Sequence, residues 1–320
     1  MTLLLIVSAC SQDDAAENNT NGNKNASENT EEMDKENDEE TEYPLEVTDT
    51  TGETVTFEEE PKRIISASPS ETEILFALGL DEEIYGVSDF DNYPEEAKEK
   101  TTVGGVVDPN AEAIIDEEPD LVVTGVSIEE EVTEKLREFD LPAYKTDADS
   151  VKDILENIKE FGIITNKQKE AKELVSDMEE DIKDVEEHVA DISEEDKKKV
   201  YIEYSPGWTV GEGEFMDELI EIAGAENVAH DTEGYSEVDE EKIIKEDPDV
   251  IIYASDLVDD DSEEELGDLI KDRSGWGEIT AIEDDQMVGI EEDIMSRPGP
   301  RVTQALKEMA EGIYPKAFED

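Results

Sequence analysis

A twelve-residue sequence that occurs twice constrains the fold of this chain more than any other feature. EAIIDEEPDLVV begins at Glu112 and EKIIKEDPDVII begins at Glu241, so the copies lie 241 − 112 = 129 residues apart. In each copy an Ile-Ile pair suits a helix, Pro-Asp interrupts that helix, and three apolar residues suit a buried parallel strand. The repeat therefore predicts two similar lobes, for which a chain of 320 residues is long enough.

The segments around the two copies predict alternating strands and helices. They indicate an α/β fold of two lobes, each with a mainly parallel sheet flanked by helices. We place the N-terminal lobe at residues 45–147, a helical connector at 148–190 and the C-terminal lobe at 191–320. A helix that begins near residue 167 is long enough, at roughly 35 Å, to bridge the lobes. Earlier in the chain, Ser70 with Glu73 three residues later predicts a helix N-cap.

The N-terminal residues predict a lipid anchor followed by a tether. Residues 3–7 are apolar, Ser8 and Ala9 are small, and Cys10 follows, a pattern that resembles the lipobox of bacterial lipoproteins. The apolar run is too short for a full signal peptide, so we interpret residues 1–10 as a truncated lipoprotein signal. Residues 11–44 are poor in apolar side chains, which predicts a disordered acidic tether.

The charge balance is extreme, with 94 acidic residues, 26 basic residues and a net charge of −68. Repulsion of this kind destabilises a compact chain. At molar salt, however, the Debye length is only about 3 Å, so we interpret the excess as the acidic surface of a halophilic protein. The sequence contains no basic patch, which argues against nucleic-acid binding.

Neither catalysis nor direct metal binding is expected. The chain has two histidines, His188 in the predicted bridging helix and His230 in a polar loop, and neither adjoins a turn that would carry a nucleophile. Two distant histidines are a poor basis for a zinc site, and residues 256–266 lack the glycine of an EF-hand loop. We therefore expect no enzyme activity, no cofactor and no directly bound metal.

Longer motifs resemble one protein family along most of the chain. PKRIISASPSETEILFALGL, YGVSDFDNYP, WTVGEGEFMDELIEIAGAENV and SRPGPRV resemble the iron-siderophore and cobalamin substrate-binding proteins of ABC importers, the helical-backbone metal receptors. The likeness is strongest to the cobalamin-binding proteins. It implies two lobes bridged by one long helix, a ligand held between them, and an extracytoplasmic location at the outer face of the membrane through a lipid on Cys10.

The resemblance also implies the partners. In that family one glutamate on each lobe docks onto arginines of the two permease subunits, and Glu112 and Glu241 occupy the matching positions. The permease dimer and its ATPase subunits would be the protein partners of a monomeric binding protein. Contact with the membrane is expected through the lipid anchor alone.

The candidate ligand-binding residues lie mainly in loops after predicted strands. Aromatic side chains with few polar groups suit a large, flat, partly apolar ligand, so cobalamin or a related corrinoid is our first interpretation. A ferric siderophore or haem stays open, because anionic chelates favour arginine. The resemblance matches Phe90, Trp208 and Tyr235 to aromatic positions of cobalamin binders, and Arg297 to a polar contact with the ligand. The full set is Ser68, Pro69, Phe90, Tyr93, Tyr204, Trp208, Tyr235, Asp293, Arg297 and Arg301.

Overall fold

The computed structural model describes residues 40–259 and 262–319. Cys10, the predicted lipoprotein signal and nearly all of the predicted tether lie outside these ranges. Within them, no helix combines the length and the apolar character that a membrane crossing requires.

The first lobe is built on a five-stranded parallel sheet with the order β5-β4-β3-β6-β7. Strands β3 and β6 carry only buried side chains, as expected for a sheet covered on both faces. An antiparallel β1–β2 hairpin precedes this sheet. The elements are β1 (Leu45–Thr48), β2 (Thr54–Phe57), β3 (Ile64–Ser66), α2 (Pro69–Ala77), η1 (Asp81–Glu83), β4 (Ile84–Val87), η2 (Glu95–Glu99), β5 (Thr101–Thr102), α3 (Ala111–Asp116), β6 (Leu121–Thr124), α4 (Glu130–Glu138) and β7 (Ala143–Lys145).

The second lobe has a four-stranded parallel sheet with the order β10-β8-β12-β13, and a separate antiparallel ribbon of β9 and β11. The two-lobed α/β architecture predicted from the repeat is thus confirmed. The elements are β8 (Lys199–Glu203), β9 (Trp208–Val210), α7 (Phe215–Ile222), β10 (Glu226–Asn227), β11 (Tyr235–Glu237), α8 (Glu240–Glu246), β12 (Val250–Ala254), α9 (Leu266–Asp272), η3 (Trp276–Glu278), α10 (Thr280–Glu283), β13 (Met287–Ile290), α11 (Glu292–Ser296), α12 (Val302–Ile313) and η4 (Pro315–Ala317).

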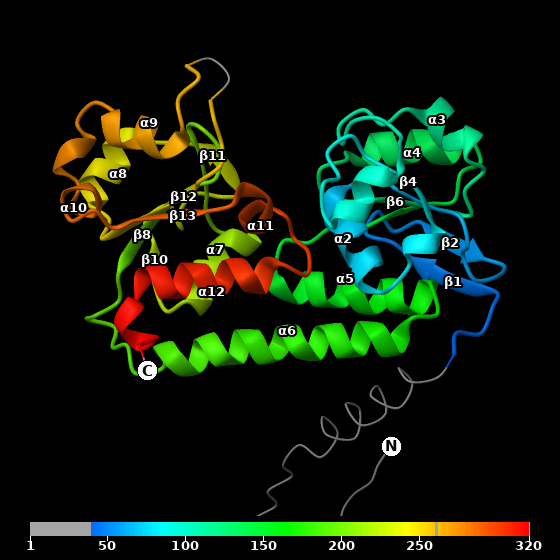
Figure 1. Cartoon of the computed structure of the whole chain (residues 1–320), viewed down its shortest axis with the longest axis horizontal. Coiled ribbons are helices and arrows are strands. Elements are labelled where there is room, and N and C mark those ends of the chain that lie inside the picture. Colours follow the sequence, from blue (N-terminus) through cyan, green and yellow to red (C-terminus); the bar gives the residue numbers. More distant parts are fainter. Residues whose placement is uncertain (1–39, 260–261, 320) are drawn as a thin grey trace, which may run out of the picture. The chain divides into compact units, whose positions relative to one another are not determined.

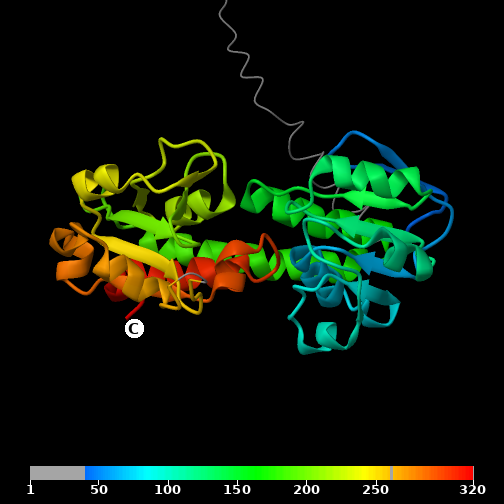
Figure 2. The same ribbon diagram turned by 90° about the horizontal axis from the view of Figure 1, so that it is seen from above.

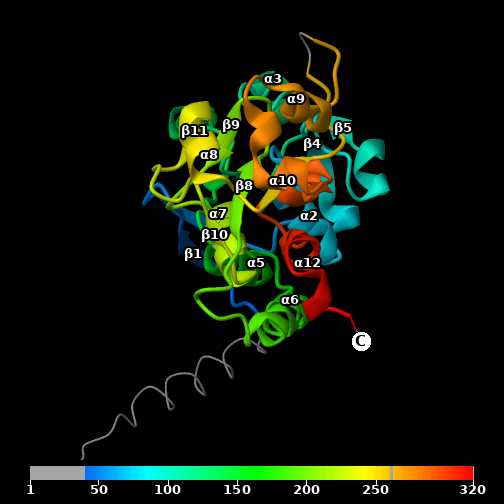
Figure 3. The same cartoon turned by 90° about the vertical axis from the view of Figure 1, so that its left-hand side faces the viewer.

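Two helices connect the lobes, α5 (Val151–Ile164) and α6 (Gln168–Val189). Ser150 and Asp153 form a capping box that fixes the start of α5. Helix α6 packs against α5 at one end and against α12 and α7 of the second lobe, as Figures 1, 2 and 3 show. Its buried face repeats at helical spacing, so one amphipathic helix serves both lobes.

The two copies of the repeat have the same local structure. Each begins a helix, α3 or α8, whose N-cap side chain (Asn110 or Asp239) accepts hydrogen bonds from backbone amides of the first turn. Just after each helix one residue has a left-handed backbone, Glu118 at φ 46° or Asp247 at φ 52°. Pro-Asp follows in both copies, so the chain reverses direction at the same point.

The aspartate of each Pro-Asp pair ties the repeat to the start of a neighbouring strand. Asp120 Oδ1 accepts from the backbone amides of Lys62 and Arg63 at 3.0 and 2.8 Å. Asp249 Oδ2 accepts from the backbone amide of Lys199 at 2.9 Å. The strands that follow, β6 and β12, pair with another strand on both sides, so the repeat marks the interior of each sheet.

The predicted N-cap at Ser70 is wrong. Helix α2 starts at Pro69 with Ser68 in the N-cap position, because proline is well suited to the first helical residue, where its missing N–H is not needed. Ser70 is therefore already inside the helix, and Glu73 is not a capping residue. Its side chain turns to the second lobe instead, as described next.

Candidate functional site

The carboxyl ends of parallel strands form the edge at which open α/β sheets bind ligands. Most of the predicted ligand-binding residues follow such ends, and Trp208 and Tyr235 are the first residues of the antiparallel strands β9 and β11. The others lie as follows: Ser68 and Pro69 after β3, Phe90 and Tyr93 after β4, Tyr204 after β8, Asp293 and Arg297 after β13, and Arg301 before α12.

Both lobes expose apolar side chains near these strand ends. Phe90 is 59% exposed and Tyr93 is 47% exposed in the first lobe. In the second lobe Trp208 is 40% exposed and Tyr235 is 41% exposed. Exposed apolar side chains gathered in one region are typical of binding surfaces. Val126 after β6 and Val258 after β12 add to this set. Sequence reasoning missed both, because a single valine in a loop has no distinctive pattern.

Three of the predicted ligand-binding residues, Asp293, Arg297 and Arg301, form an ionic cluster with Glu73 between the lobes. Glu73 of α2 accepts from Arg297 Nη1 at 3.0 Å and from both Nε and Nη2 of Arg301, at 2.8 and 2.6 Å. Arg297 also pairs with Asp293 at 2.6 Å. The Arg301 guanidinium lies 4.2 Å from the centre of the Tyr93 ring, a cation–π arrangement. Both arginines are thus held by protein carboxylates, and their role in ligand binding stays a prediction.

The loop after β4 is tied to the same cluster. Arg297 donates to the side-chain oxygen of Asn92 at 2.8 Å and to the carbonyl oxygen of Phe90 at 3.2 Å. Asn92 Nδ2 in turn donates to Asp293 Oδ2 at 2.6 Å. These bonds fix the backbone of the loop while the Phe90 ring stays exposed.

Aromatic and acidic side chains of the second lobe lie near two aspartates, Asp147 and Asp149, that come just before α5. The Tyr204 and Tyr235 rings meet edge to face with their centres 5.4 Å apart. Burial and the nearby Glu214 raise the pKa of Tyr235 above its usual range. Burial also raises the pKa of Glu214, and the negative charges of Asp149 and Asp147 add to that shift. Sequence reasoning missed this acidic group, since three more carboxylates among 94 carry no signal.

A buried polar group lies beneath the first lobe's edge. Glu71 Oε1 accepts from Thr146 Oγ1 at 2.9 Å, and a Cβ at Gly125 would lie 2.1 Å from Glu71 Oε2, so a larger residue there would have to displace the Glu71 carboxylate. Burial raises the pKa of Glu71, which hydrogen bonds from Ser68 and Thr146 offset only in part. Lys145 Nζ donates to the Gly125 carbonyl oxygen at 2.9 Å, and burial lowers its pKa.

The two glutamates predicted to dock onto a permease occupy equivalent places. Glu112 and Glu241 are each the second residue of their helix, α3 or α8, and both are exposed. In each copy the second isoleucine, Ile115 or Ile244, is also 39% exposed. Their docking role stays a prediction.

Three residues of the second lobe could together hold a metal ion. Within the part of the chain that the structure describes, Asp217, Glu221 and His230 place three donor atoms within 4.8 Å of one another. They belong to α7 and to the loop after β10.

Comparison with known proteins places the chain among binding proteins. A family model described as periplasmic binding protein matches residues 64–294. The uncharacterised ABC transporter substrate-binding lipoprotein YvrC of Bacillus subtilis is 33% identical over 87% of this chain and 88% of its own length. A cobalamin-binding protein of Halobacterium salinarum is 25% identical over 85% of this chain and 74% of its own.

A solved structure agrees with these relatives. A possible iron-binding, periplasmic solute-binding protein of Staphylococcus epidermidis superposes with a TM-score of 0.67 and 30% identity, over 80% of this chain and all of that one. The names of these similar proteins therefore include both a cobalamin binder and a possible iron binder.

Proposed function

The chain belongs to the periplasmic binding protein family of ABC importers, and on that premise we propose that it captures cobalamin or a related corrinoid and delivers it to a permease. The exposed aromatic side chains at the strand ends of both lobes carry this proposal. Flat rings with a few polar neighbours suit a large and partly apolar ligand. The name of one relative, a cobalamin-binding protein, supports the same choice.

The arginines of the chain favour a corrinoid over an anionic ferric chelate. All five arginines are paired with carboxylates: Arg63 with Glu117, Arg137 with Asp49, Arg273 with Glu203, and Arg297 and Arg301 with Glu73. An anionic siderophore or haem would have to draw an arginine out of such a pair, and it would meet the charges of Asp147, Asp149 and Glu214. A ferric siderophore remains the second candidate because of the iron-binding relative.

Equilibrium titration of the full chain tests the ligand. We expect saturable binding of cyanocobalamin at one site and no comparable binding of ferric siderophores, with the ligand recovered unchanged. Trp208→Ala and Phe90→Ala should each weaken binding about tenfold, since a buried aromatic contact is worth roughly 1–2 kcal/mol. Phe139→Ala is the matched control, because Phe139 is 56% exposed but lies at the end of α4. Saturable siderophore binding without corrinoid binding would reverse the choice.

The free energy of unfolding, measured at low and at molar NaCl, tests the proposed adaptation to salinity. Among the described residues only six acidic side chains are buried, so the rest contribute to a surface of like charge: Asp49, Glu71, Glu73, Asp91, Glu203 and Asp217. Screening this repulsion should raise the free energy of unfolding as NaCl is added. Stability that is indifferent to salt would contradict this interpretation.

For the permease contact, we take Glu112 and Glu241 as the docking residues. They hold the same helical position in both copies of the repeat, and pairing with arginine would orient a binding protein on a two-fold permease. Charge reversal at both, Glu112→Lys with Glu241→Lys, should abolish uptake by the reconstituted importer and leave ligand affinity unchanged. Glu131→Lys with Glu283→Lys makes the same charge change at one exposed position on each lobe and should leave uptake intact.

The remaining parts of the proposal concern the cellular setting. A lipid on Cys10 would hold a monomeric protein at the outer face of the membrane, and the ATPase subunits of the importer would supply the energy. Metabolic labelling with a fatty acid tests the anchor. Label that persists in Cys10→Ser would rule it out.

A further inference from the structure

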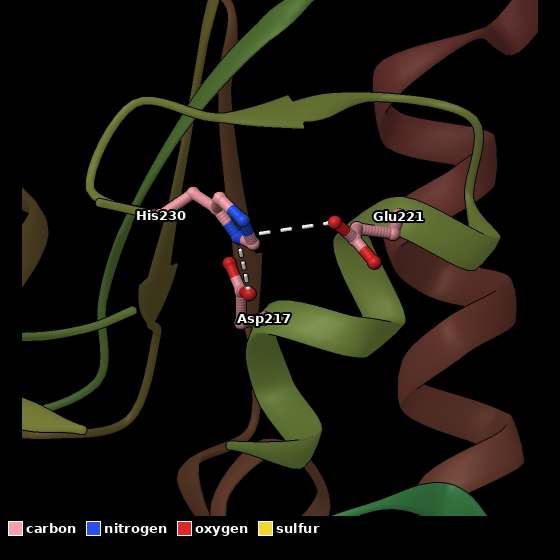
Figure 4. Close-up of side chains that lie close together, drawn as sticks. All are labelled: Asp217, Glu221 and His230. Atoms are coloured by element: carbon pink, nitrogen blue, oxygen red, sulfur yellow. Dashed lines mark hydrogen bonds and ion pairs between the residues drawn. The ribbon is translucent and has the colours of Figure 1, made fainter. Parts of the chain in front are cut away.

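One cluster of side chains combines the donor types of a metal site with a geometry that supports one. Asp217 and Glu221 lie four residues apart on α7, so they project from the same face of that helix. His230 approaches them from the loop after β10, as Figure 4 shows. His230 Nδ1 is 2.8 Å from Asp217 Oδ2 and 3.8 Å from Glu221 Oε1.

The distance expected between two ligand atoms of one bound ion lies between these two values. With metal–ligand bonds of about 2.0–2.1 Å and tetrahedral angles, two ligand atoms lie about 3.3 Å apart. The Asp217–His230 separation would widen by about half an ångström and the Glu221–His230 separation would shrink by a similar amount. The Glu221 side chain is 59% exposed, so it has the rotamer freedom for that adjustment. One imidazole and two carboxylates are ligands that zinc and related divalent ions accept.

The positions of Asp217 and His230 are already fixed by a neighbouring side chain. Asp217 is buried, and its Oδ1 accepts from Asn227 Nδ2 at 2.7 Å. Asn227 also accepts, through its backbone oxygen, from the His230 amide at 3.1 Å, and through Oδ1 from the Ala229 amide at 2.9 Å. One buried asparagine thus orients both the carboxylate and the turn that carries the imidazole, as outer-shell groups do in metal sites.

The cluster is open to solvent and strongly negative. The His230 side chain is 47% exposed, so water has access to the remaining coordination positions. Glu212 adds a further negative charge near His230. An ion entering from solvent would therefore meet attraction and an unobstructed path.

We propose that Asp217, Glu221 and His230 bind a divalent transition-metal ion, for which Zn²⁺ is the best fit, and that the ion fastens residues 228–234 to α7. That segment already bonds to the neighbouring loop, since Glu212 donates its amide to the carbonyl oxygens of His230 and Thr232 at 3.1 and 2.8 Å. One of the two joined loops follows β9 and the other leads into β11, and these strands carry Trp208 and Tyr235. The ion would therefore brace an aromatic wall of the second lobe. This inference does not depend on which ligand the protein transports.

The other histidine provides a matched control. His188 on α6 lies 3.7 Å from Asp184 Oδ1, the histidine–carboxylate pair that the structure gives it, and its ring stacks on Phe318 with centres 4.6 Å apart. Because the chain has two histidines, His188→Gln leaves only the proposed ligand and His230→Gln leaves only the control.

The test is calorimetric titration of Zn²⁺ into the full chain carrying Cys10→Ser, which removes the thiol, with excess Mg²⁺ to occupy surface carboxylates. One equivalent should bind, His230→Gln and Glu221→Gln should each weaken binding at least about tenfold, and His188→Gln should bind like the parent. Glu221→Gln is decisive, because it leaves the Asp217–His230 hydrogen bond in place and so separates a metal site from a hydrogen-bonded pair.

Two further readouts fix the location. Zn²⁺ should shift the imidazole NMR signals of His230 and not those of His188, and it should raise the melting temperature of the parent but not of His230→Gln. Equal affinity in the parent, Glu221→Gln and His230→Gln, or an unshifted His230 imidazole at saturating Zn²⁺, would overturn the proposal. The hydrogen-bonded pair alone would then account for the geometry.

Discussion

Glu71 in the first lobe and Glu203 in the second are both buried, at 3% and 0% exposure, yet the lobes accommodate them differently. Glu203 holds the Arg273 guanidinium through both oxygens at 2.8 and 2.7 Å and also accepts from Tyr201 Oη at 2.6 Å. Burial raises the pKa of Glu71, and hydrogen bonds from Ser68 and Thr146 and the nearby charge of Lys145 lower it only in part. One lobe neutralises a buried carboxylate with an arginine, and the other favours its protonated form.

The difference shows where the two similar lobes have diverged. Their shared repeat sets the helix, the turn and the central strand, and those agree closely. The buried glutamates come from other segments, α2 and β8. The shared topology therefore determines the backbone arrangement of both lobes. The buried charged groups near the strand ends differ between the lobes, because they come from segments outside the repeat.

Removing the arginine should have the largest effect. Arg273→Ala leaves Glu203 buried without its cation, which typically costs about 3–5 kcal/mol. Urea unfolding followed by circular dichroism measures the loss. Lys183→Ala is the control, because its pair with Glu187 is exposed and should cost less than about 0.5 kcal/mol. Similar losses in the two variants would remove the contrast between the glutamates.

Glu73 shares features of both cases, since it is buried but paired with arginines of the other lobe. Glu73→Gln should cost about 2–3 kcal/mol, because two guanidinium groups lose a charged acceptor. The same unfolding measurement applies. A loss below about 0.5 kcal/mol would mean that the lobes do not depend on this cluster for stability.

The equivalent aspartates of the repeat should have a smaller effect, about 1 kcal/mol each. Asp120 accepts from two backbone amides and Asp249 from one, so Asp120→Ala should cost more than Asp249→Ala. Paired urea curves, with exposed Asp116→Ala as the control for charge removal, measure the difference. The reverse order would contradict the assignment of these bonds.

Glu71→Gln should give the smallest change and the opposite sign, a gain of about 1 kcal/mol or less at pH 8. The folded pKa of Glu71 lies above its unfolded value. As pH rises through the unfolded value, the unfolded chain loses its proton first, so the wild type loses stability until the folded pKa is passed. The glutamine variant lacks this loss. The urea midpoint of the variant should therefore exceed that of the wild type by more at pH 8 than at pH 4. An equal difference between the two proteins at both pH values would rule the explanation out.

The fold was largely predictable because its signals are local. The repeat, the apolar strands and the helical spacing of α6 each lie within short segments. The β9–β11 ribbon was missed, since Trp208 lies in a glycine-rich sequence that predicts a loop. Glu73 was assigned to a cap because its spacing from Ser70 matches one, but Pro69 moved the helix start.

The candidate site was less predictable because its decisive contacts are distant in sequence. Glu73 meets Arg297 and Arg301 more than two hundred residues away, and no pattern in one sequence encodes that pairing. The closeness of Asp217, Glu221 and His230 was missed for the same reason. His230 was placed in a polar loop, and its closeness to α7 depends on the tertiary fold.

The residues with a left-handed backbone have a consequence for engineering. Outside glycine, the described residues adopt positive φ at six positions, all of them acidic or asparagine: Glu118, Asp140, Asn166, Asp247, Glu263 and Asp285. Each acidic residue there costs on the order of 1 kcal/mol relative to glycine. A laboratory version intended for dilute buffer, where repulsion is least screened, can exchange several of them for glycine. An exchange at Glu118, Asp140, Glu263 or Asp285 would relieve backbone strain and remove a negative charge, whereas Asp247 also accepts hydrogen bonds from Thr280 that glycine would lose. The first four positions therefore hold a reserve of stability that the natural chain leaves unused.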